Sequence, residues 1–325
     1  MSVVELRDLQ FVGSGLRRPE CVLCTSDGSL YASNWDGGVT RVAANGAQSQ
    51  LVAKDPPITL KPNGIALCSD SSFLLANLGD DGGIWRLDTQ GACSPVVTSI
   101  DGEELPPCNF VTTDVDGRTW FTVSTRQRPR HRAWRADVAD GFVAVADRKG
   151  ARIVADGLGY TNEIQFHPSG DWLYINETFA RRLSRCRLTG NGGLGKRETV
   201  IEFGEGVFPD GLCFDEAGGI WIVSIVSNQV IRIDANGAEE FIISDSDPEH
   251  VSAVEKAYLS REMQPEHLGN VGQSQLRNVS SIAFGGPGRR RSYLGCLLGD
   301  RIVSFEAPVR GIKPIHWDWC AAEWR

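Results

Sequence analysis

One short pattern of polar and apolar positions recurs six times along the chain. Each copy begins with a polar residue, continues through about four mostly apolar residues, and has Gly, or Ser in the second copy, eight positions after its start. The copies occupy residues 20–28, 63–71, 109–117, 162–170, 210–218 and 280–288. A short apolar run that leads into a glycine is typical of a β-strand followed by a hairpin turn. We therefore predict that each copy opens a β-hairpin.

A second apolar segment follows each predicted turn. In chain order these segments are SLYASN, SFLLAN, RTWFTV, DWLYIN, GIWIVS and RSYLGC, and a third such as GIWRLD often comes next. Successive copies are 43, 46, 53, 48 and 70 residues apart, which is the size of a four-stranded propeller blade. An eight-stranded barrel, the alternative all-β fold, does not explain so long a repeat.

Helical periodicity is nearly absent, so we predict an all-β protein. The prediction is one six-bladed β-propeller domain over residues 1–325, with four-stranded antiparallel blades around a central channel. The longest interval contains a polar segment, residues 244–277, with one stretch that favours a helix. We interpret this segment as an inserted loop or lid.

The first residues of the six copies form a column. They are Glu20, Asn63, Asn109, Asn162, Asp210 and Ser280. Equivalent positions of propeller blades surround the axis, so these side chains are expected to converge on one mouth of the channel. At any single position Asn, Asp or Ser is also a common turn residue. Two carboxylates in a narrow channel, however, repel each other and lose hydration unless a cation binds them.

The column therefore predicts a site for one divalent metal ion. Carboxylate and amide oxygens suit Ca²⁺, Mg²⁺ or Mn²⁺ best, and the absence of His and Cys from the column makes Zn²⁺ a weaker candidate.

Charge and composition argue against several other classes. The chain has a formal net charge of -8 with 33 Lys and Arg residues spread along it, and so lacks the basic footprint of a nucleic-acid-binding protein. The start, MSVVELRDLQ, carries charges where a secretory signal needs apolar residues, and no window approaches the ~18 apolar residues of a membrane span. Nine scattered Cys residues favour reduced thiols. We expect a cytoplasmic monomer or small homo-oligomer with no membrane or nucleic-acid partner.

Four segments carry a resemblance to a known family. They are RPECVL (18–23), KPNGIAL (61–67), residues 160–188, which begin YTNEIQFHPSG, and FPDGLCFDEAGGIWI (208–222). With these segments the chain resembles the family of senescence marker protein (regucalcin), gluconolactonase and luciferin-regenerating enzyme. The resemblance implies a propeller enzyme with one catalytic metal ion. Its substrate would be a small-molecule lactone, a cyclic ester, which the enzyme hydrolyses.

The resemblance also implies roles for members of the column. Glu20, Asn162 and Asp210 match the metal ligands of the family, and Asn109 matches an Asn that contacts substrate or metal. We assign Asp210 as metal ligand and general base, because a carboxylate beside the ion can take a proton from water. Asn63, in the column, and Phe110, directly after Asn109, are further candidates for contacts with the substrate.

One position departs from the sugar-lactonase pattern. Members that hydrolyse sugar lactones carry Arg two residues before the third-blade Asn, where this chain has Pro107. Proline donates no hydrogen bond from its side chain or nitrogen, which favours a non-sugar lactone. A phosphotriesterase-like hydrolase with the same metal site and a non-catalytic calcium- or protein-binding propeller remain as alternatives, because fold alone does not separate them.

Several polar and aromatic residues receive structural interpretations. Glu163 is expected to point away from the axis, since side chains alternate along a strand. The basic loop 124–135 is expected to be a solvated connection, although a carboxylate-binding role is an alternative. Arg181 and Arg182 are interpreted as a solvated surface pair. Trp317, Trp319 and Trp324, near the end of the chain, are expected to pack where the ring closes.

Overall fold

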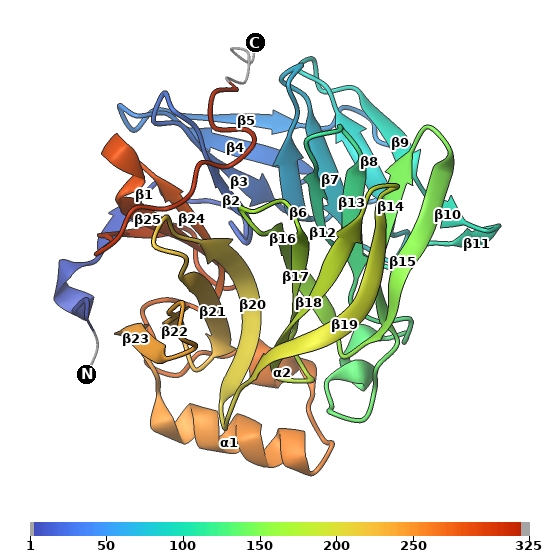
Figure 1. Ribbon diagram of the computed structural model, residues 1–325. Coiled ribbons are helices and arrows are strands. Elements are labelled where there is room, and N and C mark those ends of the chain that lie inside the picture. Colours follow the sequence, from blue (N-terminus) through green and yellow to red (C-terminus); the bar gives the residue numbers. More distant parts are fainter. Residues whose placement is uncertain (1–2, 320–325) are drawn as a thin grey trace.

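Six four-stranded antiparallel sheets surround a central axis in the computed structural model, which describes residues 3–319 (Figure 1). The first strands of neighbouring blades contact one another around the whole ring. Blades one and two consist of β2 (Val22–Cys24), β3 (Leu30–Asn34), β4 (Gly38–Val42) and β5 (Gln48–Val52), then β6 (Pro62–Leu67), β7 (Phe73–Asn77), β8 (Ile84–Leu87) and β9 (Cys93–Val97). The predicted six-bladed propeller is confirmed.

The middle blades follow the same order. Blades three and four consist of β12 (Cys108–Thr113), β13 (Thr119–Val123), β14 (Gly141–Asp147) and β15 (Gly150–Leu158), then β16 (Thr161–Phe166), β17 (Trp172–Glu177), β18 (Arg182–Thr189) and β19 (Gly193–Glu202). A small hairpin of β10 (Ser99–Ile100) and β11 (Glu103–Glu104) precedes blade three. A 3-10 turn, η2 (Arg130–Ala133), lies between β13 and β14.

The last blade joins the two ends of the chain. Blades five and six consist of β20 (Val207–Phe214), β21 (Ile220–Val226), β22 (Gln229–Ile233) and β23 (Glu239–Ser244), then β24 (Val279–Gly285), β25 (Arg291–Cys296), β26 (Ile302–Glu306) and the N-terminal β1 (Gln10–Val12). Strand β1 follows the 3-10 turn η1 (Leu6–Asp8), and η3 (Pro287–Arg289) connects β24 to β25. Because β1 pairs antiparallel with β26, the N-terminal segment closes the ring.

The C-terminal segment runs over the end of the channel opposite the α-helices. Residues 312–316 border a cavity there, and the carbonyl of Trp317 accepts a hydrogen bond of 2.7 Å from the Ser26 amide of blade one. Trp317 is partly buried against a cluster of side chains from blades one and six, and Trp319 against a cluster that extends over blades one to four. The predicted packing position of Trp324 lies outside the described residues.

An Asp recurs in the turn between the first and second strands of several blades, where its carboxylate accepts hydrogen bonds from the turn. Asp215 accepts the amide hydrogens of Ala217 and Gly219 at 2.8 Å, and also the indole hydrogen of Trp221 and the guanidinium of Arg232. Asp27, Asp70 and Asp114 cap the equivalent turns of blades one to three. Burial opposes ionisation of Asp215, but these donors outweigh it and the pKa lies below the usual value.

Two glycines directly after column residues allow the first strands to approach each other. A Cβ on Gly211 would lie 2.5 Å from Ser281 Cα, and a Cβ on Gly64 would lie 2.7 Å from Phe110 Cα. Both of these Cα atoms belong to the backbone of the next blade, and a backbone atom cannot move away without moving its strand. The Asn-Gly and Asp-Gly pairs of the repeat are therefore required by packing around the axis.

Replacing Gly211 by Ala is expected to lower the free energy of unfolding by about 1–3 kcal/mol, the usual cost of overpacking. Gly190→Ala is the matched control, because no atom lies within 4 Å of its added Cβ and its φ is not positive. Urea unfolding followed by tryptophan fluorescence measures both variants. Equal stability of the two would contradict the close approach of blades five and six.

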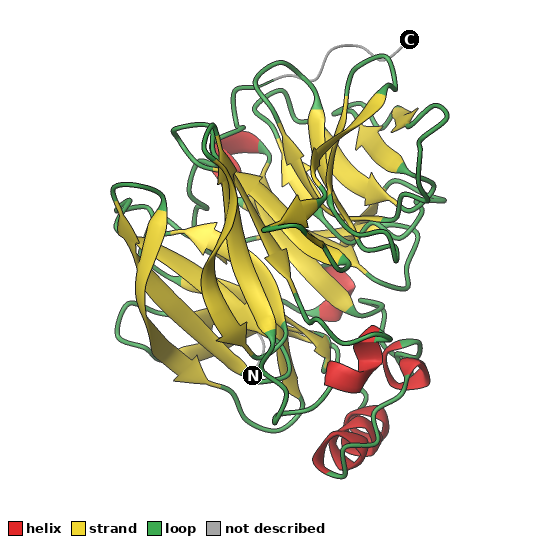
Figure 2. Cartoon of the chain, turned by 90° about the vertical axis from the view of Figure 1, so that its right-hand side faces the viewer, coloured by secondary structure: helices red, strands yellow, loops and turns green. Residues whose placement is uncertain are grey.

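The inserted segment forms two helices at one end of the propeller. Helix α1 (Pro248–Leu259) begins after Asp247, whose carboxylate accepts the amide hydrogens of Glu249 and His250, and α2 (Pro265–Leu268) follows. Val254, Ala257 and Tyr258 of α1 are buried against blades four and five. Figure 2 shows the helices gathered at this end. No helix within residues 3–319 has the length and apolar character needed to span a bilayer.

Candidate metal centre and its cavity

A break in strand pairing occurs at the column in five of the six blades. The register of the first strand with the second shifts between residues 62 and 65, 108 and 110, 161 and 164, 209 and 212, and 279 and 281. In blade one, Glu20 simply precedes β2. A β-bulge leaves its extra residue outside the ladder and changes the direction of side chains. The bulges thus release the column residues from regular pairing at the start of each inner strand.

Four column residues meet at a cavity of about 300 Å³ at the helical end of the axis. Glu20, Asn109, Asn162 and Asp210 line it and are almost fully buried. The other two members are adjacent to them. Asn63 Nδ2 donates to the backbone oxygen and Oδ1 of Asn109 at 3.1 and 3.3 Å, and Ser280 Oγ donates to the Glu20 carbonyl at 3.0 Å.

Hydrogen bonds fix the orientation of the Asn162 amide. Thr178 Oγ1 donates to the carbonyl of Pro209 at 2.8 Å, so it can only accept from Asn162 Nδ2, which lies 3.0 Å away. Asn162 Oδ1 is then left buried with no hydrogen-bond partner. Asn109 is held similarly, by Nδ2 on Ser124 Oγ at 3.0 Å. Such an unpartnered buried oxygen is a suitable ligand for a cation.

The carboxylates of the site are close enough to affect one another. Burial, followed by the charges of Glu20 and Glu163, raises the pKa of Asp210 well above its usual value, and Arg18 and Arg130 oppose this rise. Arg18 donates to Glu20 Oε2 from Nε and Nη2 at 3.0 and 2.6 Å. Since a buried carboxylate is costly without a positive partner, a cation beside Asp210 would stabilise its ionised form.

The residues present fit a divalent metal ion. No group of three or more His, Cys, Asp or Glu side chains within residues 3–319 could hold a metal by itself, so an ion here needs amide oxygen as well. Glu20, Asp210 and the unpartnered Asn162 Oδ1 provide such a mixed oxygen set. These three residues lie at one cavity, and their predicted role as metal ligands stays a prediction.

The basic loop 124–135 forms part of the cavity wall, contrary to its interpretation as a solvated connection. Arg126 is half-exposed, as expected, but Arg130 and Trp134 line the cavity. Trp134 Nε1 donates to the Tyr160 hydroxyl at 2.9 Å, and Trp134 stacks on Phe179 with ring centroids 5.8 Å apart. The sequence did not predict this position of the loop, because the position depends on aromatic contacts with blade four.

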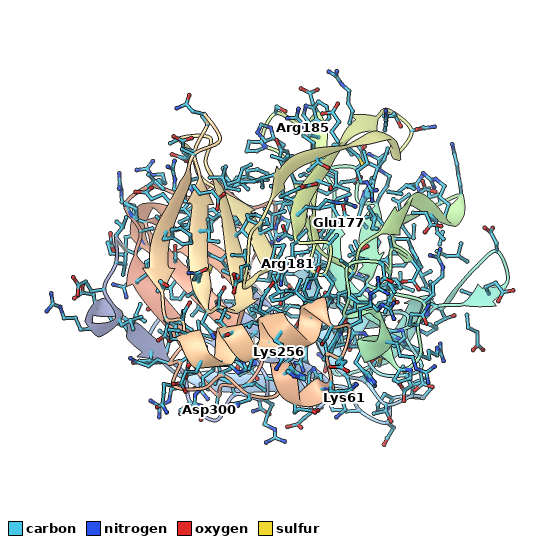
Figure 3. All side chains as sticks on the ribbon, turned by 90° about the horizontal axis from the view of Figure 1, so that it is seen from below. Lys61, Glu177, Arg181, Arg185, Lys256 and Asp300 are labelled. Carbon is cyan, nitrogen blue, oxygen red and sulfur yellow. The ribbon has the colours of Figure 1, made fainter. Side chains whose placement is uncertain are left out.

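Arg181 and Arg182 are not a solvated pair. Arg181 forms an ion pair with Glu255 of α1, with both side chains largely buried, and its guanidinium lies 4.0 Å from the centroid of the Tyr258 ring. Arg182 pairs instead with the buried Glu177 at 2.7 Å. Figure 3 shows the helix that carries Lys256 lying across this end, close to Arg181 in the view. The two arginines thus fasten the inserted segment and blade four.

Helix α2 and the residues after it border the opening. Pro265, Leu268 and Gly269 line the cavity together with Leu297 and Leu298 of blade six. The inserted segment therefore forms part of the cavity wall, and its interpretation as a lid stays a prediction. Its apolar residues line the same cavity as the column residues.

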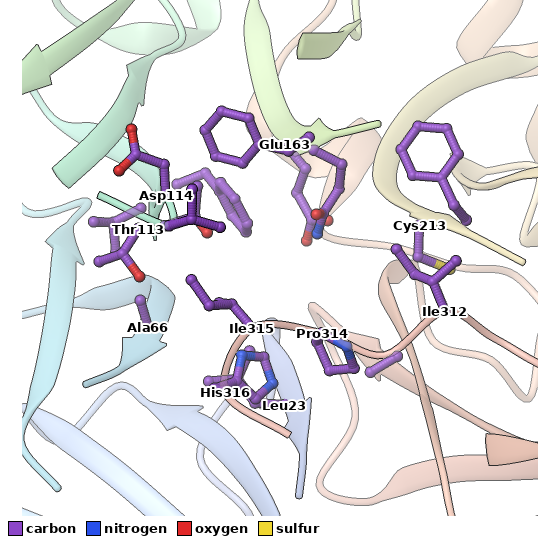
Figure 4. A pocket seen from close by; sticks show the side chains of 18 of the residues that line it. Leu23, Ala66, Thr113, Asp114, Glu163, Cys213, Ile312, Pro314, Ile315 and His316 are labelled. Carbon is purple, nitrogen blue, oxygen red and sulfur yellow. The ribbon is translucent and has the colours of Figure 1, made fainter. Parts of the chain in front are cut away.

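Glu163, labelled in Figure 4, lines a second cavity at the opposite end of the axis, and Phe110 is also part of its lining. This cavity, of about 580 Å³, is largely apolar and also includes Cys213 and His316. Glu163 was predicted to point away from the axis, which is wrong, because the bulge between residues 161 and 164 interrupts the alternation of side chains. Phe110 lies on this side and not with Asn109.

The environment of Glu163 favours its neutral form. Its Oε2 accepts the Leu212 amide hydrogen at 3.0 Å, but burial, with the charge of Glu20 adding to it, raises its pKa well above the usual value. Glu163 therefore links blades four and five beneath the column rather than completing the ligand set.

The fold and the cavity together describe a six-bladed propeller with a buried, oxygen-lined cavity at one end of its axis. The family model described as the SMP-30/gluconolactonase/LRE-like region matches residues 18–253. The chain belongs to this family.

Individual relatives share only low sequence identity with the chain. The chain is 29% identical to the 6-deoxy-6-sulfogluconolactonase of Pseudomonas putida over 158 residues, which is 48% of this chain and 52% of the relative. It is 24% identical to the adipocyte plasma membrane-associated protein of Gallus gallus over 233 residues, 68% of this chain and 52% of the relative. The chain thus aligns with about half the length of these curated relatives.

A solved structure shares the fold over nearly its full length. The regucalcin of Agrobacterium tumefaciens, described as a calcium-binding protein, superposes with a TM-score of 0.64 and 19% identity, covering 95% of this chain and 98% of that one.

Proposed function

We propose that this chain is a metal-dependent hydrolase that opens a lactone ring in the cavity beneath α2. The observation that carries the proposal is the meeting of Glu20, Asp210 and the unpartnered Asn162 Oδ1 at one buried cavity. Membership of a family that includes gluconolactonase supports it, as does the similarity to a sulfogluconolactonase.

The ligands and the base would come from different blades. Glu20, Asn162 and Asp210 would hold one divalent ion, Ca²⁺, Mn²⁺, Mg²⁺ or Zn²⁺. When bound, such an ion polarises an ester carbonyl and makes water more acidic. Asn109, held by Ser124, would orient the substrate oxygen. Blades one, four and five would thus each contribute one oxygen ligand.

Asp210 is the proposed proton acceptor. Burial, with the charges of Glu20 and Glu163 adding to it, raises its pKa, and a bound ion would keep its carboxylate ionised and able to accept a proton. It would take a proton from the water that attacks the ring carbonyl. Glu20, which forms an ion pair with Arg18, would then bind the ion without acting as a base.

The walls of the cavity favour a ring with few hydroxyl groups. Trp35, Trp134 and Leu268 supply apolar surface, and the buried Pro107 provides no hydrogen-bond donor at the position where sugar-lactonases carry Arg. We therefore propose a non-sugar lactone as substrate.

Acid release from a panel of sugar and non-sugar lactones tests the proposal. Purified protein is assayed before and after chelation, with Mn²⁺, Zn²⁺, Ca²⁺ and Mg²⁺ restored separately. We expect turnover that chelation removes and at least one ion restores, with non-sugar rings preferred. Turnover of phosphotriesters alone would indicate the alternative hydrolase, and no turnover with any ion would contradict the enzymatic proposal.

A further inference from the structure

Arg130 is a positive group in the cavity wall, and its charge acts on Asp210 without an ion pair between them. It lines the same cavity as Asp210, and within residues 3–319 it forms no ion pair with Asp or Glu. Its Nε is buried without a hydrogen-bond partner. A guanidinium stays protonated at any physiological pH, so a buried N–H of this group without an acceptor is costly.

Two other arginines of the loop and the second arginine of the cavity bind carboxylates. In the same loop, Arg126 binds Asp156 in a bidentate pair at 2.9 and 3.0 Å, and Arg135 binds Asp137. Arg18, the second arginine of the cavity, is occupied by Glu20. Arg130 is thus distinguished by facing the cavity rather than a carboxylate of its own loop.

The position of Arg130 is supported by aromatic residues. Its guanidinium carbon lies 5.6 Å from the centroid of the Tyr160 ring, and Tyr160 is held by Trp134 and by an edge-on contact with Phe179 at 4.8 Å. A cation over an aromatic face is stabilised without losing its charge. Tyr160 therefore supports the guanidinium while leaving its hydrogen-bonding edge for a ligand.

We propose that Arg130 binds a singly charged oxyanion on the substrate, a carboxylate or a sulfonate that is not part of the ring ester. This inference rests on the proposed lactonase function and names its substrate class: a lactone that carries an anionic group. The planar guanidinium matches the two oxygens of such a group. The anion would then lie at Arg130 and the ester at the column, in one cavity.

A matched pair of lactones tests the inference. The pair is 5-oxotetrahydrofuran-2-carboxylate and its carboxamide, with the corresponding sulfonate as a third compound. We expect Arg130→Met to reduce the preference in kcat/KM for an anionic lactone over the carboxamide by about 10- to 100-fold, and Arg130→Lys to reduce it less. Arg126→Met, which removes an arginine of the same loop outside the cavity, should keep the wild-type preference. Loss of preference in both Met variants, or in neither, would overturn the inference.

Binding without turnover separates this inference from the proposed function. Calorimetry compares 2-hydroxyglutarate, which has two carboxylates, with 4-hydroxybutyrate, which has one, on the wild type and on Arg130→Met. We expect the wild type to bind the dicarboxylate at least tenfold more tightly, and the variant to lose this difference. If no lactone is hydrolysed but this difference is found, the lactonase proposal fails and the anion site stands. If lactones are hydrolysed and the variant keeps the difference, only the anion site fails.

Discussion

Replacing Asp210 by Asn is expected to lower kcat for the best lactone by about 10²–10⁴-fold, the usual contribution of a positioned general base. The amide keeps the size of the side chain but cannot take a proton from water. It also removes one negative charge from the proposed ligand set, so the affinity for the divalent ion should fall as well. Steady-state kinetics and calorimetric titration with Mn²⁺ measure the two effects separately.

Asp101→Asn is the control for this experiment. Asp101 is exposed in the β10–β11 turn, away from the column, and its replacement should leave kcat and ion affinity at wild-type values. A variant at Asp210 that keeps wild-type kcat would refute its role as base. A normal ion affinity with a large fall in kcat would retain the base and remove Asp210 from the ligand set.

Replacing Glu177 by Ala is expected to lower the free energy of unfolding by about 3–5 kcal/mol, the cost of breaking one side of a buried ion pair. Glu177 ends β17 and is fully buried. Its carboxylate accepts the Gly159 amide hydrogen at 2.7 Å and two guanidinium hydrogens of Arg182 at 2.8 and 2.7 Å. The substitution leaves these donors without an acceptor.

Glu198→Ala provides the comparison, because its pair with Arg185 is on the surface, where such pairs contribute about 0–1 kcal/mol. Urea unfolding at pH 7 measures both variants, and equal losses would contradict the structural role of Glu177. Burial works against ionisation of Glu177, but Arg182 and the other donors leave its pKa below the usual value. Its stabilising contribution is therefore complete above the unfolded pKa of about 4.3 and is lost as the pH falls through the folded pKa.

The sequence predicted the fold because each repeat encodes one blade locally. The apolar runs specify the strands, the turn residues such as Asp215 cap the hairpins, and the interval between copies sets the blade size. The column followed from the same register, since six equivalent positions must surround one axis. Four of its members do meet at one cavity.

The directions of Glu163 and Phe110 could not be predicted from alternation. Alternation assumes a regular ladder, but the bulges at residues 161–164 and 108–110 break it where the strands enter the axis. A further signal was present and could have been used. Ser124 and Thr178, which orient Asn109 and Asn162, lie 15 and 16 residues after them in equivalent places beyond the second strand.

Arg130 and Arg181 were missed for a different reason. Their roles depend on loops that pack against other blades, and Arg181 meets Glu255, 74 residues later in the chain. No local pattern distinguishes an arginine that turns toward the axis from one in solvent. The directions of Arg130 and Arg181 depend on the packing of Trp134 and Tyr258 against blade four.

Anomalous diffraction from a crystal soaked in Mn²⁺ would locate the proposed ion. Mn²⁺ scatters strongly enough to be located without reference to activity or substrate. We expect one dominant peak in direct contact with Glu20, Asn162 Oδ1 and Asp210 at the helical end of the axis. A peak beside Glu163 in the opposite cavity, with none at the column, would contradict this expectation.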